Sequence, residues 1–296
     1  MTKSQLAKFE GFVIKQAEMF FHNQGFVPLF PPKVVRASGA CENVNTLFDV
    51  QVEDDDKWFG RSAYLSQTGQ LYLEAYVAEL NKVYCLGPSF RAEPKIDDRH
   101  LTEFMMLEIE FAGDFNDLLS HIESMIYHLA QMVGNSQEAI AEFGLDKATT
   151  ERLLKCPPVL TKLTYDQAIT KLKELGEKIE WGDDISSKRE KILLANNNEQ
   201  PLFITHYPDP MWDHGKEIEV EKFFNMLPDK KTPGRVLSSD LILPFGGEAV
   251  GAAARVDSLE VLIARLENSK MYQRLVEKGG DLQDFEWYIE HLKKHG

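Results

Sequence analysis

"GPSFRAEPKIDDRHLTEFMMLEIEF", residues 87–111, alternates charged and large apolar side chains on both sides of a short polar segment. An alternation of this kind has the period of a half-buried β-strand. The segment between the two runs, residues 94–101, contains one proline and two aspartates, which are typical turn residues. The stretch therefore predicts an antiparallel hairpin whose loop carries both signs of charge.

The charged residues of this hairpin need partners. Alternation places Arg91 and Glu93 on one face of the first strand, and Glu108 and Glu110 on one face of the second. Charges beside buried Phe and Leu are costly unless they are paired. Two interpretations follow: a structural ladder of ion pairs across the strands, or a nucleotide site with arginine for phosphate and carboxylates for a metal or an amine.

Composition indicates a cytoplasmic globular protein. The chain has 296 residues, of which 43% are hydrophobic and 27% charged, and these values are ordinary for a globular domain. No apolar run approaches the length of a membrane span, and the first residues lack the apolar core of a signal peptide. Cys41, Cys85 and Cys156 have no paired spacing, which indicates reduced thiols and no metal motif.

The net charge bears on partners. With 47 acidic and 33 basic residues, the formal net charge is −14. Such a surface repels nucleic acid unless its basic groups are concentrated in one place. We therefore expect no DNA partner and no general RNA-binding module, although a local basic cleft stays open.

Apolar spacing predicts the other elements of an α+β domain. Helices are expected at 5–21, 69–80, 115–133, 258–268 and 284–294, and strands at 47–50, 63–66, 82–90, 201–208 and 240–256. The pattern weakens over 134–200, which predicts a variable, peripheral segment. We expect one domain over residues 1–296, an antiparallel β-sheet flanked by helices.

A second concentration of chemistry lies in "SSDLILPFGGEAVGAAARVD", residues 238–257. Asp240 and Glu248 supply oxygen ligands of the type that magnesium prefers, and Arg255 follows a run of small alanines. The alternative is a tight glycine hairpin with a surface arginine. Two other segments, 205–215 and 291–296, contain histidines but fit no metal motif. We expect 205–215 to be a surface loop and 291–296 to be a solvated helix end. Cys85 is expected to be a core thiol.

The segment "FRAEPKIDDRHLTEF", residues 90–104, resembles motif 2 of class II aminoacyl-tRNA synthetases of the aspartyl, asparaginyl and lysyl subgroup. "SQTGQLYLE" (66–74) resembles the substrate helix of its asparaginyl members, and "GFVPLFPPKV" (25–34) resembles motif 1, with its proline at Pro32. "CEN" (41–43) lies where this family has a Cys-Glu-Gly turn. "DLILPFGGEAVGAAARVDS" (240–258) resembles the pair of strands that, in this family, carries the magnesium ligands and a substrate-binding arginine.

The resemblance implies an ATP site. In that family's arrangement Arg91 would hold the α-phosphate, stabilising charge that develops in the transition state, and would be the catalytic residue. Glu93 would bind near the adenine or the amino acid, and Phe104 would stack on the adenine ring. The outer phosphates would contact Arg99 and His100.

The resemblance also implies a metal and an amino-acid site. Asp240 and Glu248 would bind Mg²⁺, which neutralises the pyrophosphate leaving group. Glu42 and Gln70 would receive the α-ammonium of the substrate, and Arg255 would reach its side-chain carbonyl oxygen. Positioning and electrostatics, rather than an enzyme nucleophile, would carry the rate.

Leu73 favours asparagine as the substrate. Aspartyl relatives have a lysine at this position, three residues after the glutamine matching Gln70, and that lysine pairs with the substrate carboxylate. A carboxylate facing Leu73 would lose its ion partner, whereas an amide tolerates the loss. The resemblance thus implies activation of asparagine, or less favourably aspartate, as an adenylate by an asparagine-tRNA ligase-like enzyme.

Two departures from the family keep other functions open. We expect a catalytic region without the family's N-terminal anticodon-binding OB-fold, which argues against specific tRNA charging, and without the motif 3 strand and helix. The alternatives are a stand-alone asparagine synthetase with ammonia as acceptor, or a non-catalytic paralog that binds an amino acid or a partner. Motif 1 implies a homodimer.

Overall fold

A computed structural model describes residues 1–37, 44–51, 63–93, 101–220 and 222–295. The chain forms two compact units, each assembled from three segments. The first unit consists of Met1–Gly25, Gly113–Tyr207 and Leu237–Ala254, and the second of Phe26–Ala112, Pro208–Val236 and Arg255–Gly296. The prediction of one catalytic domain with a variable segment at 134–200 stays a prediction.

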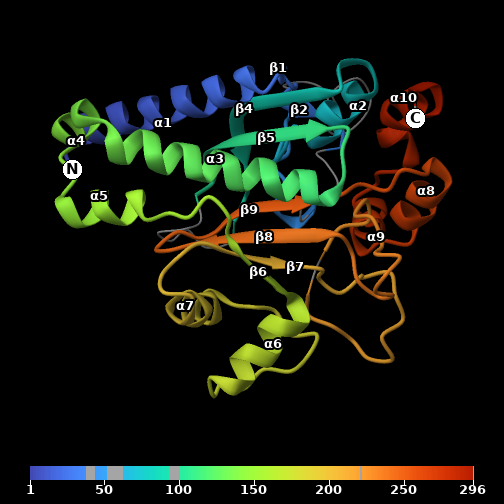
Figure 1. Cartoon of the computed structure of the whole chain (residues 1–296). Helices are drawn as coiled ribbons and strands as arrows, with labels where there is room; N and C mark the ends of the chain where they lie inside the picture. Colours follow the sequence, from blue (N-terminus) through green and yellow to red (C-terminus); the bar gives the residue numbers. More distant parts are fainter. Residues whose placement is uncertain (38–43, 52–62, 94–100, 221, 296) are drawn as a thin grey trace. The chain divides into compact units, whose positions relative to one another are not determined.

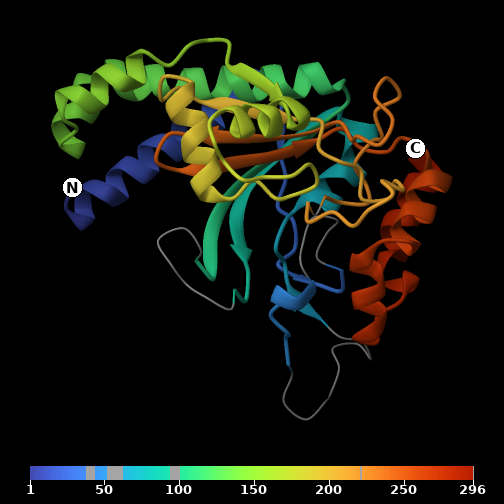
Figure 2. The same ribbon diagram turned by 90° about the horizontal axis from the view of Figure 1, so that it is seen from below.

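The second unit is built on the predicted hairpin. Strands β4 (Lys82–Phe90) and β5 (Glu103–Phe111) are antiparallel, in a register that pairs the first residue of β4 with the last of β5. The short strand β1 (Val27–Pro28) runs parallel to β4. Figure 2 shows β4 and β5 (teal to green) as a long twisted ribbon. The hairpin prediction is confirmed, while the loop at 94–100 lies outside the described residues.

The first strand ends earlier than the alternation predicts. We expected Arg91 and Glu93 on the strand, but β4 ends at Phe90. One further hydrogen bond follows, because the Arg91 N–H donates to the Thr102 carbonyl at 2.9 Å. Arg91 therefore lies just past the end of β4, still joined to the opposite strand by one backbone hydrogen bond.

Helices cover the hairpin and complete the second unit. Helix α2 (Gln70–Leu80) packs on β4 and β5, and α10 (Glu286–His295) packs on α2. Leu73 of α2 lies against Val83 and Cys85 of β4 in a small apolar cluster. The other elements of this unit are β2 (Val34–Val35), η1 (Val44–Thr46), β3 (Tyr64–Leu65), α8 (Leu259–Glu267), α9 (Lys270–Glu277) and η2 (Leu282–Phe285).

A four-stranded sheet in the order β6-β7-β8-β9 forms the centre of the first unit. Strands β6 and β7 are parallel, and the other two pairings are antiparallel. The bounds are β6 (Thr161–Thr164), β7 (Leu202–Thr205), β8 (Ser238–Leu243) and β9 (Gly247–Ala253). A register shift between Leu241 and Ile242 marks a bulge in the β8–β9 pairing.

Helices lie on both faces of this sheet (Figure 1). Helix α3 (Phe115–Asn135) covers one face, where Phe115 and Leu119 join a core with Phe203 and Leu241. Helices α6 (Tyr165–Glu174) and α7 (Ser187–Asn196) contact the sheet strands from the other side. The remaining helices are α1 (Lys3–Asn23), α4 (Gln137–Phe143) and α5 (Lys147–Leu154).

The predicted α+β class is confirmed, and further elements differ in detail. The expected strand at 47–50 is reduced to a single bridge between Asp49 and Tyr64. Strand β6 and helix α9 were not predicted from the apolar pattern. Of the helices in the described residues, none is both long and apolar enough to cross a membrane.

Candidate functional site

A mostly buried ion pair joins Arg255 to Glu110 in the second unit. The Arg255 Nη2 donates to Glu110 Oε1 at 2.9 Å, and its Nε donates to the same oxygen at 3.3 Å. The Arg255 side chain is 20% exposed and the Glu110 side chain 13%. Arg255 is placed by a backbone bridge to Met226, just after β9 ends, while Glu110 lies near the end of β5. The pair thus ties the predicted substrate arginine to the predicted hairpin.

Gln70 contacts the same two guanidinium nitrogens as Glu110. It is the first residue of α2, is buried, and follows the N-cap Gly69. With its carbonyl oxygen turned toward Arg255, it accepts from Nε and Nη2 at 3.2 Å each and from Asn225 Nδ2 at 2.5 Å. The structure therefore brings together Gln70 and Arg255, two residues predicted to bind the amino acid.

Two further residues belong to this cluster and were missed by sequence reasoning. The Tyr288 hydroxyl of α10 donates to Glu74 Oε1 at 2.6 Å. Glu74 lies one helical turn after Gln70, so the i, i+4 spacing on α2 was the signal that could have identified it. Tyr288 comes from an unrelated helix, and no spacing indicates it. We refer to Gln70, Glu74, Glu110, Arg255 and Tyr288 as the carboxylate–arginine cluster.

Burial controls the titration of this cluster. It raises the pKa of Glu110 to about 7, against the opposing effect of Arg255. It also raises the pKa of Glu74, and Arg255 and the Tyr288 hydroxyl again oppose the shift. The pKa of Tyr288 lies well above its ordinary value because the ring is buried and close to Glu74. One arginine thus faces two carboxylates whose protonation is sensitive to their surroundings.

Neighbouring residues of the hairpin are structural. Glu108 accepts from the Gly69 N–H at 2.8 Å and from the Thr68 hydroxyl, at the N-terminus of α2. Leu73 is 0% exposed. Cys85 is a buried thiol whose pKa is raised to about 12 by burial, as expected of a core cysteine. Among the described residues, the ion-pair partner of Glu110 lies outside the hairpin, and Glu108 accepts from the start of α2 and from the Cys85 thiol opposite it on β4. Neither glutamate forms an ion pair across the two strands there.

Arg91 and Phe104 form a second site element. The guanidinium carbon of Arg91 lies 5.2 Å from the centroid of the Phe104 ring, within the range of a cation–π contact. Within the described part of the chain, the buried Nε of Arg91 has no hydrogen-bond partner. A buried donor without a partner is costly, so this nitrogen is suited to a ligand acceptor.

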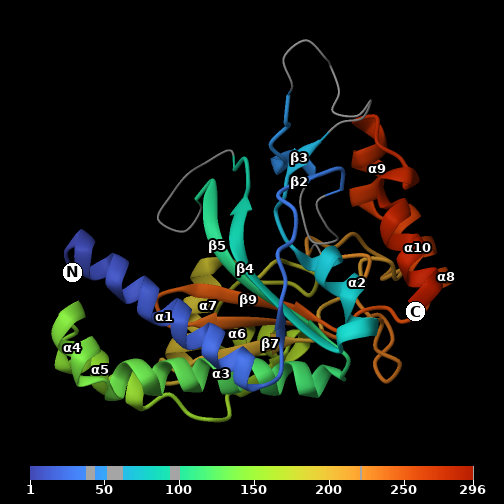
Figure 3. The same ribbon diagram turned by 90° about the horizontal axis from the view of Figure 1, so that it is seen from above.

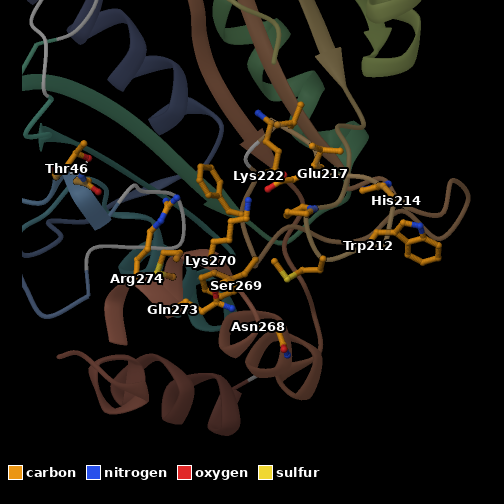
Figure 4. Close-up of a pocket in the computed structure, with 18 of the residues that line it drawn as sticks. Thr46, Trp212, His214, Glu217, Lys222, Asn268, Ser269, Lys270, Gln273 and Arg274 are labelled. Atoms are coloured by element: carbon orange, nitrogen blue, oxygen red, sulfur yellow. Dashed lines mark hydrogen bonds between the residues drawn. The ribbon is translucent and has the colours of Figure 1, made fainter. Parts of the chain in front are cut away.

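Arg91 and Glu93 line a pocket of about 590 Å³ in the second unit. Figure 4 shows Lys270, Gln273 and Arg274 of α9 on one side of this pocket and Glu217 and Lys222 on another. The charged lining residues are Arg91, Glu93, Lys216, Glu217, Lys222, Lys270 and Arg274. Five of these seven are basic, although the whole chain carries a net charge of −14. The pocket is thus a local basic site of the kind left open by the composition.

A buried pair supports the wall of this pocket. Both oxygens of Asp209 accept from Arg265, at 2.9 and 3.0 Å, and the Arg265 Nε donates to the Phe224 carbonyl at 2.6 Å. Phe224 itself lines the pocket. The expectation of a surface loop at 205–215 is wrong for Asp209, which is 3% exposed, because the distant Arg265 compensates its charge.

The predicted metal ligands lie in the first unit. Asp240 of β8 is buried and pairs with Gly251 of β9, and Glu248 projects from β9 with its side chain exposed. The pKa of Tyr207 is raised well above its ordinary value, first by burial and then by the nearby charges of Asp240 and Glu248. Two carboxylates therefore gather on adjacent strands around one tyrosine.

Three predicted residues have no described position. Glu42, Arg99 and His100 lie outside the described residues. Their proposed contacts with the α-ammonium and the outer phosphates stay predictions.

The chain matches the family model for class II tRNA synthetases (D, K and N) over residues 2–296. It is 36% identical over 295 residues to an asparagine–tRNA ligase of Thermococcus gammatolerans, covering 99% of this chain and 61% of that protein. It is 37% identical over 286 residues to the asparagine–tRNA ligase of Pyrococcus abyssi, covering 96% and 59%. The chain thus spans about three fifths of these curated relatives.

Solved structures give a similar result. The crystal structure of asparaginyl-tRNA synthetase from Pyrococcus horikoshii complexed with asparaginyl-adenylate superposes with a TM-score of 0.79 at 34% identity. The match covers 98% of this chain and 60% of that one. The Entamoeba histolytica asparaginyl-tRNA synthetase, also in complex with asparaginyl-adenylate, gives a TM-score of 0.76 at 27% identity.

Proposed function

The chain belongs to the class II tRNA synthetases (D, K and N), and from this premise we propose that it activates asparagine with ATP to form asparaginyl-adenylate. In this reaction an oxygen of the amino-acid carboxylate attacks the α-phosphorus of ATP, a new phosphorus–oxygen bond forms, and pyrophosphate leaves. The relatives whose names carry this function are asparagine–tRNA ligases, and two of the matched structures hold the same adenylate.

The Arg255–Glu110 pair is the observation that carries the proposal. An arginine donor and a carboxylate acceptor that lie 2.9 Å apart match the two ends of a carboxamide. The asparagine side-chain carbonyl would accept from Arg255, and its NH₂ group would donate to Glu110. An aspartate side chain would instead place a third carboxylate beside Glu110 and Glu74, which costs several kcal/mol of like-charge repulsion.

Leu73 supports the same choice of substrate. It is fully buried in an apolar cluster, so α2 offers no cation at this position to pair with an aspartate carboxylate. We propose that Leu73 favours asparagine because it gives an aspartate carboxylate no positive charge to pair with. Gln70 would receive the α-ammonium together with Glu42.

The basic pocket supports an ATP site. Arg91 presents a buried Nε that has no hydrogen-bond partner among the residues the structure describes, and four further basic residues line the same cavity. We propose that Arg91 contacts the α-phosphate, where it would stabilise the charge that develops during attack. Glu93 would orient the nucleotide or amino acid. Phe104 would stack on the adenine through the ring face that Arg91 leaves open.

Asp240 and Glu248 fit magnesium by the chemistry of their donor set. Both are carboxylates on adjacent strands, and Mg²⁺ binds through one or two carboxylates plus phosphate oxygens and waters. Gly251 adds no side chain here, whereas a Cβ at that position would lie 3.5 Å from Glu248 Oε1. We propose that these two residues hold the ion, which supplies charge neutralisation for pyrophosphate when it is bound.

The acceptor of the activated amino acid is a separate proposal. We propose tRNA, as the names of the relatives indicate. The competing function is a stand-alone asparagine synthetase, which would activate aspartate instead, so that ammonia attacks aspartyl-adenylate and AMP leaves. A cytoplasmic homodimer formed through the motif 1 region is the assembly that we propose. Measuring transfer of labelled asparagine to tRNA, against formation of asparagine from labelled aspartate and ammonia, separates the two functions.

Pyrophosphate exchange tests the activation step. Wild-type protein and Arg91→Ala are compared with asparagine, with aspartate and without amino acid. We expect exchange that requires asparagine and falls by about 100-fold or more in Arg91→Ala, the usual cost of losing one transition-state donor. Arg189→Ala, on α7, is the matched control. If neither asparagine nor aspartate supports any exchange, while asparagine or ATP still raises the melting temperature, the non-catalytic amino-acid-binding function would replace this proposal.

A further inference from the structure

Two histidines of α10 and one glutamate of α2 lie together outside the site described above. We expected the segment 291–296 to be a solvated helix end, and Lys293 and Lys294 are indeed exposed. His291 and His295, however, are half-buried and lie close to Glu79. Figure 3 shows α2 and α10 as neighbours, and the two helices are in direct contact. The expectation was therefore wrong for the histidines.

The spacing of the two histidines is suited to a metal ion. Residues four apart on a helix lie on the same face, so His291 and His295 both face α2. Their rings stack with centroids 4.6 Å apart. One ligand atom from each histidine and one from Glu79 all lie within 4.8 Å of one another. The three donors come from two helices, as they do in metal sites that connect separate elements.

The polar atoms of this group are incompletely satisfied. The Nε2 of His291 is buried and, within the described ranges, has no hydrogen-bond partner. The Nε2 of His295 lies 3.5 Å from Glu79 Oε1, which is too long for a good hydrogen bond. A buried imidazole nitrogen without a partner is costly. A cation between the three donors would satisfy all of them at once.

The donor set identifies the class of ion. Two imidazoles and one carboxylate are a ligand combination that zinc accepts, with a fourth position for water. Zinc ligands lie about 2.0–2.2 Å from the metal, so donors in a tetrahedral site are about 3.3 Å apart. Small side-chain rotations bring three atoms that already lie within 4.8 Å to that spacing. Magnesium, which prefers oxygen ligands, is disfavoured here.

We propose that Glu79, His291 and His295 form a binding site for a divalent transition metal of the zinc type. The ion connects α2 to α10. These are the helices that carry Glu74 and Tyr288, whose hydrogen bond belongs to the carboxylate–arginine cluster. The site is therefore structural: it fixes the packing of two helices that shape the amino-acid site, and it takes no part in the proposed reaction.

Zinc titration of the full chain tests the proposal. Untagged protein is stripped with a chelator and titrated with ZnCl₂ by calorimetry, and Co²⁺ serves as a visible spectroscopic probe of the same site. We expect one ion per chain. His291→Gln and His295→Gln should each weaken zinc binding by about 100-fold or more, because losing even an outer-sphere partner costs 10–100-fold. His22→Gln, an exposed histidine of α1, should leave zinc binding unchanged.

The readout is metal binding, so the result does not depend on the proposed activity. Far-UV circular dichroism of each variant checks that the helices persist. Zinc binding that survives in the His291→Gln/His295→Gln double variant would locate the ion elsewhere, for example at a cysteine, and would overturn the proposal. Wild-type protein that binds no zinc at tens of micromolar would overturn it as well.

Discussion

Arg255 and Glu110 are 145 positions apart in the chain and share a hydrogen bond of 2.9 Å. Each residue alone fits several roles, but together they form a donor–acceptor pair with the polarity of a carboxamide site. Glu110 is therefore a specificity residue in the proposed function, in addition to the arginine that the sequence predicted. This relationship gives the first two predictions.

Glu110→Gln should weaken discrimination against aspartate. The variant removes the negative charge that repels an aspartate side chain, and the carboxamide of glutamine keeps the shape of the site. We expect the ratio of kcat/KM for asparagine to that for aspartate to fall by about tenfold or more, since 1.4 kcal/mol corresponds to a factor of ten. Pyrophosphate exchange measures both values. Glu103→Gln, an exposed residue of the same strand, is the control, and an unchanged ratio in Glu110→Gln would remove this residue from substrate selection.

Glu110 should also make stability depend on pH. Its pKa rises from 4.5 to about 7 on folding, mainly through burial, so the folded state binds the proton more tightly. The stabilisation is complete below about pH 4.5 and is lost as the pH rises through about 7. Relative to Glu110→Gln, wild-type protein should gain on the order of 1–3 kcal/mol in free energy of unfolding between pH 8 and pH 5.

Urea unfolding at several pH values measures this difference. Glu103→Gln should follow wild-type protein at every pH, because that side chain is exposed on the same strand. A difference between wild type and Glu110→Gln that is independent of pH would show that Glu110 titrates alike in both states. It would leave the selectivity prediction untouched.

The fold was largely predictable from periodicity. The β4–β5 hairpin and helices α1, α2 and α3 follow from alternating or helical apolar spacing, because each buries one face against a core. Strand β6 was missed because its residues, Thr161–Thr164, are mostly polar and form a short edge strand. Helix α9 was missed because it is only eight residues long and mostly polar, although its few apolar residues share one face. Short, mostly polar elements are hard to recognise from apolar spacing.

The candidate site was predictable only in part. Arg91, Phe104, Gln70 and Arg255 came from motif resemblance, and the structure pairs Arg91 with Phe104 and Gln70 with Arg255. The partners of these residues depend on tertiary contacts. Tyr288 reaches Glu74 across 214 positions, and no local pattern encodes such a distance. Sequence reasoning therefore found residues with functional groups and missed the neighbours that set their charge.

Asp240→Asn should raise the magnesium requirement. The substitution removes one of two carboxylates proposed as ligands and keeps nearly the same side-chain shape. We expect the Mg²⁺ concentration for half-maximal pyrophosphate exchange to rise by about tenfold or more. Losing even a residue that only supports a metal ligand weakens metal affinity by about 10–100-fold. Asp257→Asn, an exposed aspartate, is the control. Equal magnesium curves for Asp240→Asn and wild type would exclude Asp240 as a ligand.

Arg265→Met should destabilise the protein by about 3–5 kcal/mol, because it leaves Asp209 buried without its partner. The double variant Asp209→Leu/Arg265→Met should recover much of the loss, since replacing both charges removes the uncompensated one. Denaturant unfolding measures the free energy in each case. The exposed pair of Lys171 with Glu174 provides the control, and Lys171→Met should change stability by less than about 1 kcal/mol. A double variant as unstable as the single one would contradict this account.

Arg274→Ala should weaken ATP binding with little effect on the chemical step. Arg274 lines the same pocket as Arg91, and both are basic. If Arg274 contributes to ground-state binding of the nucleotide, its removal raises KM for ATP by about tenfold and leaves kcat nearly unchanged. Salt screens charge interactions, so the ratio of the two KM values should shrink as ionic strength increases. Lys293→Ala, an exposed lysine on α10, should match wild type at all salt concentrations. A loss confined to kcat would instead place Arg274 next to the charge that forms during attack, as a partner of Arg91.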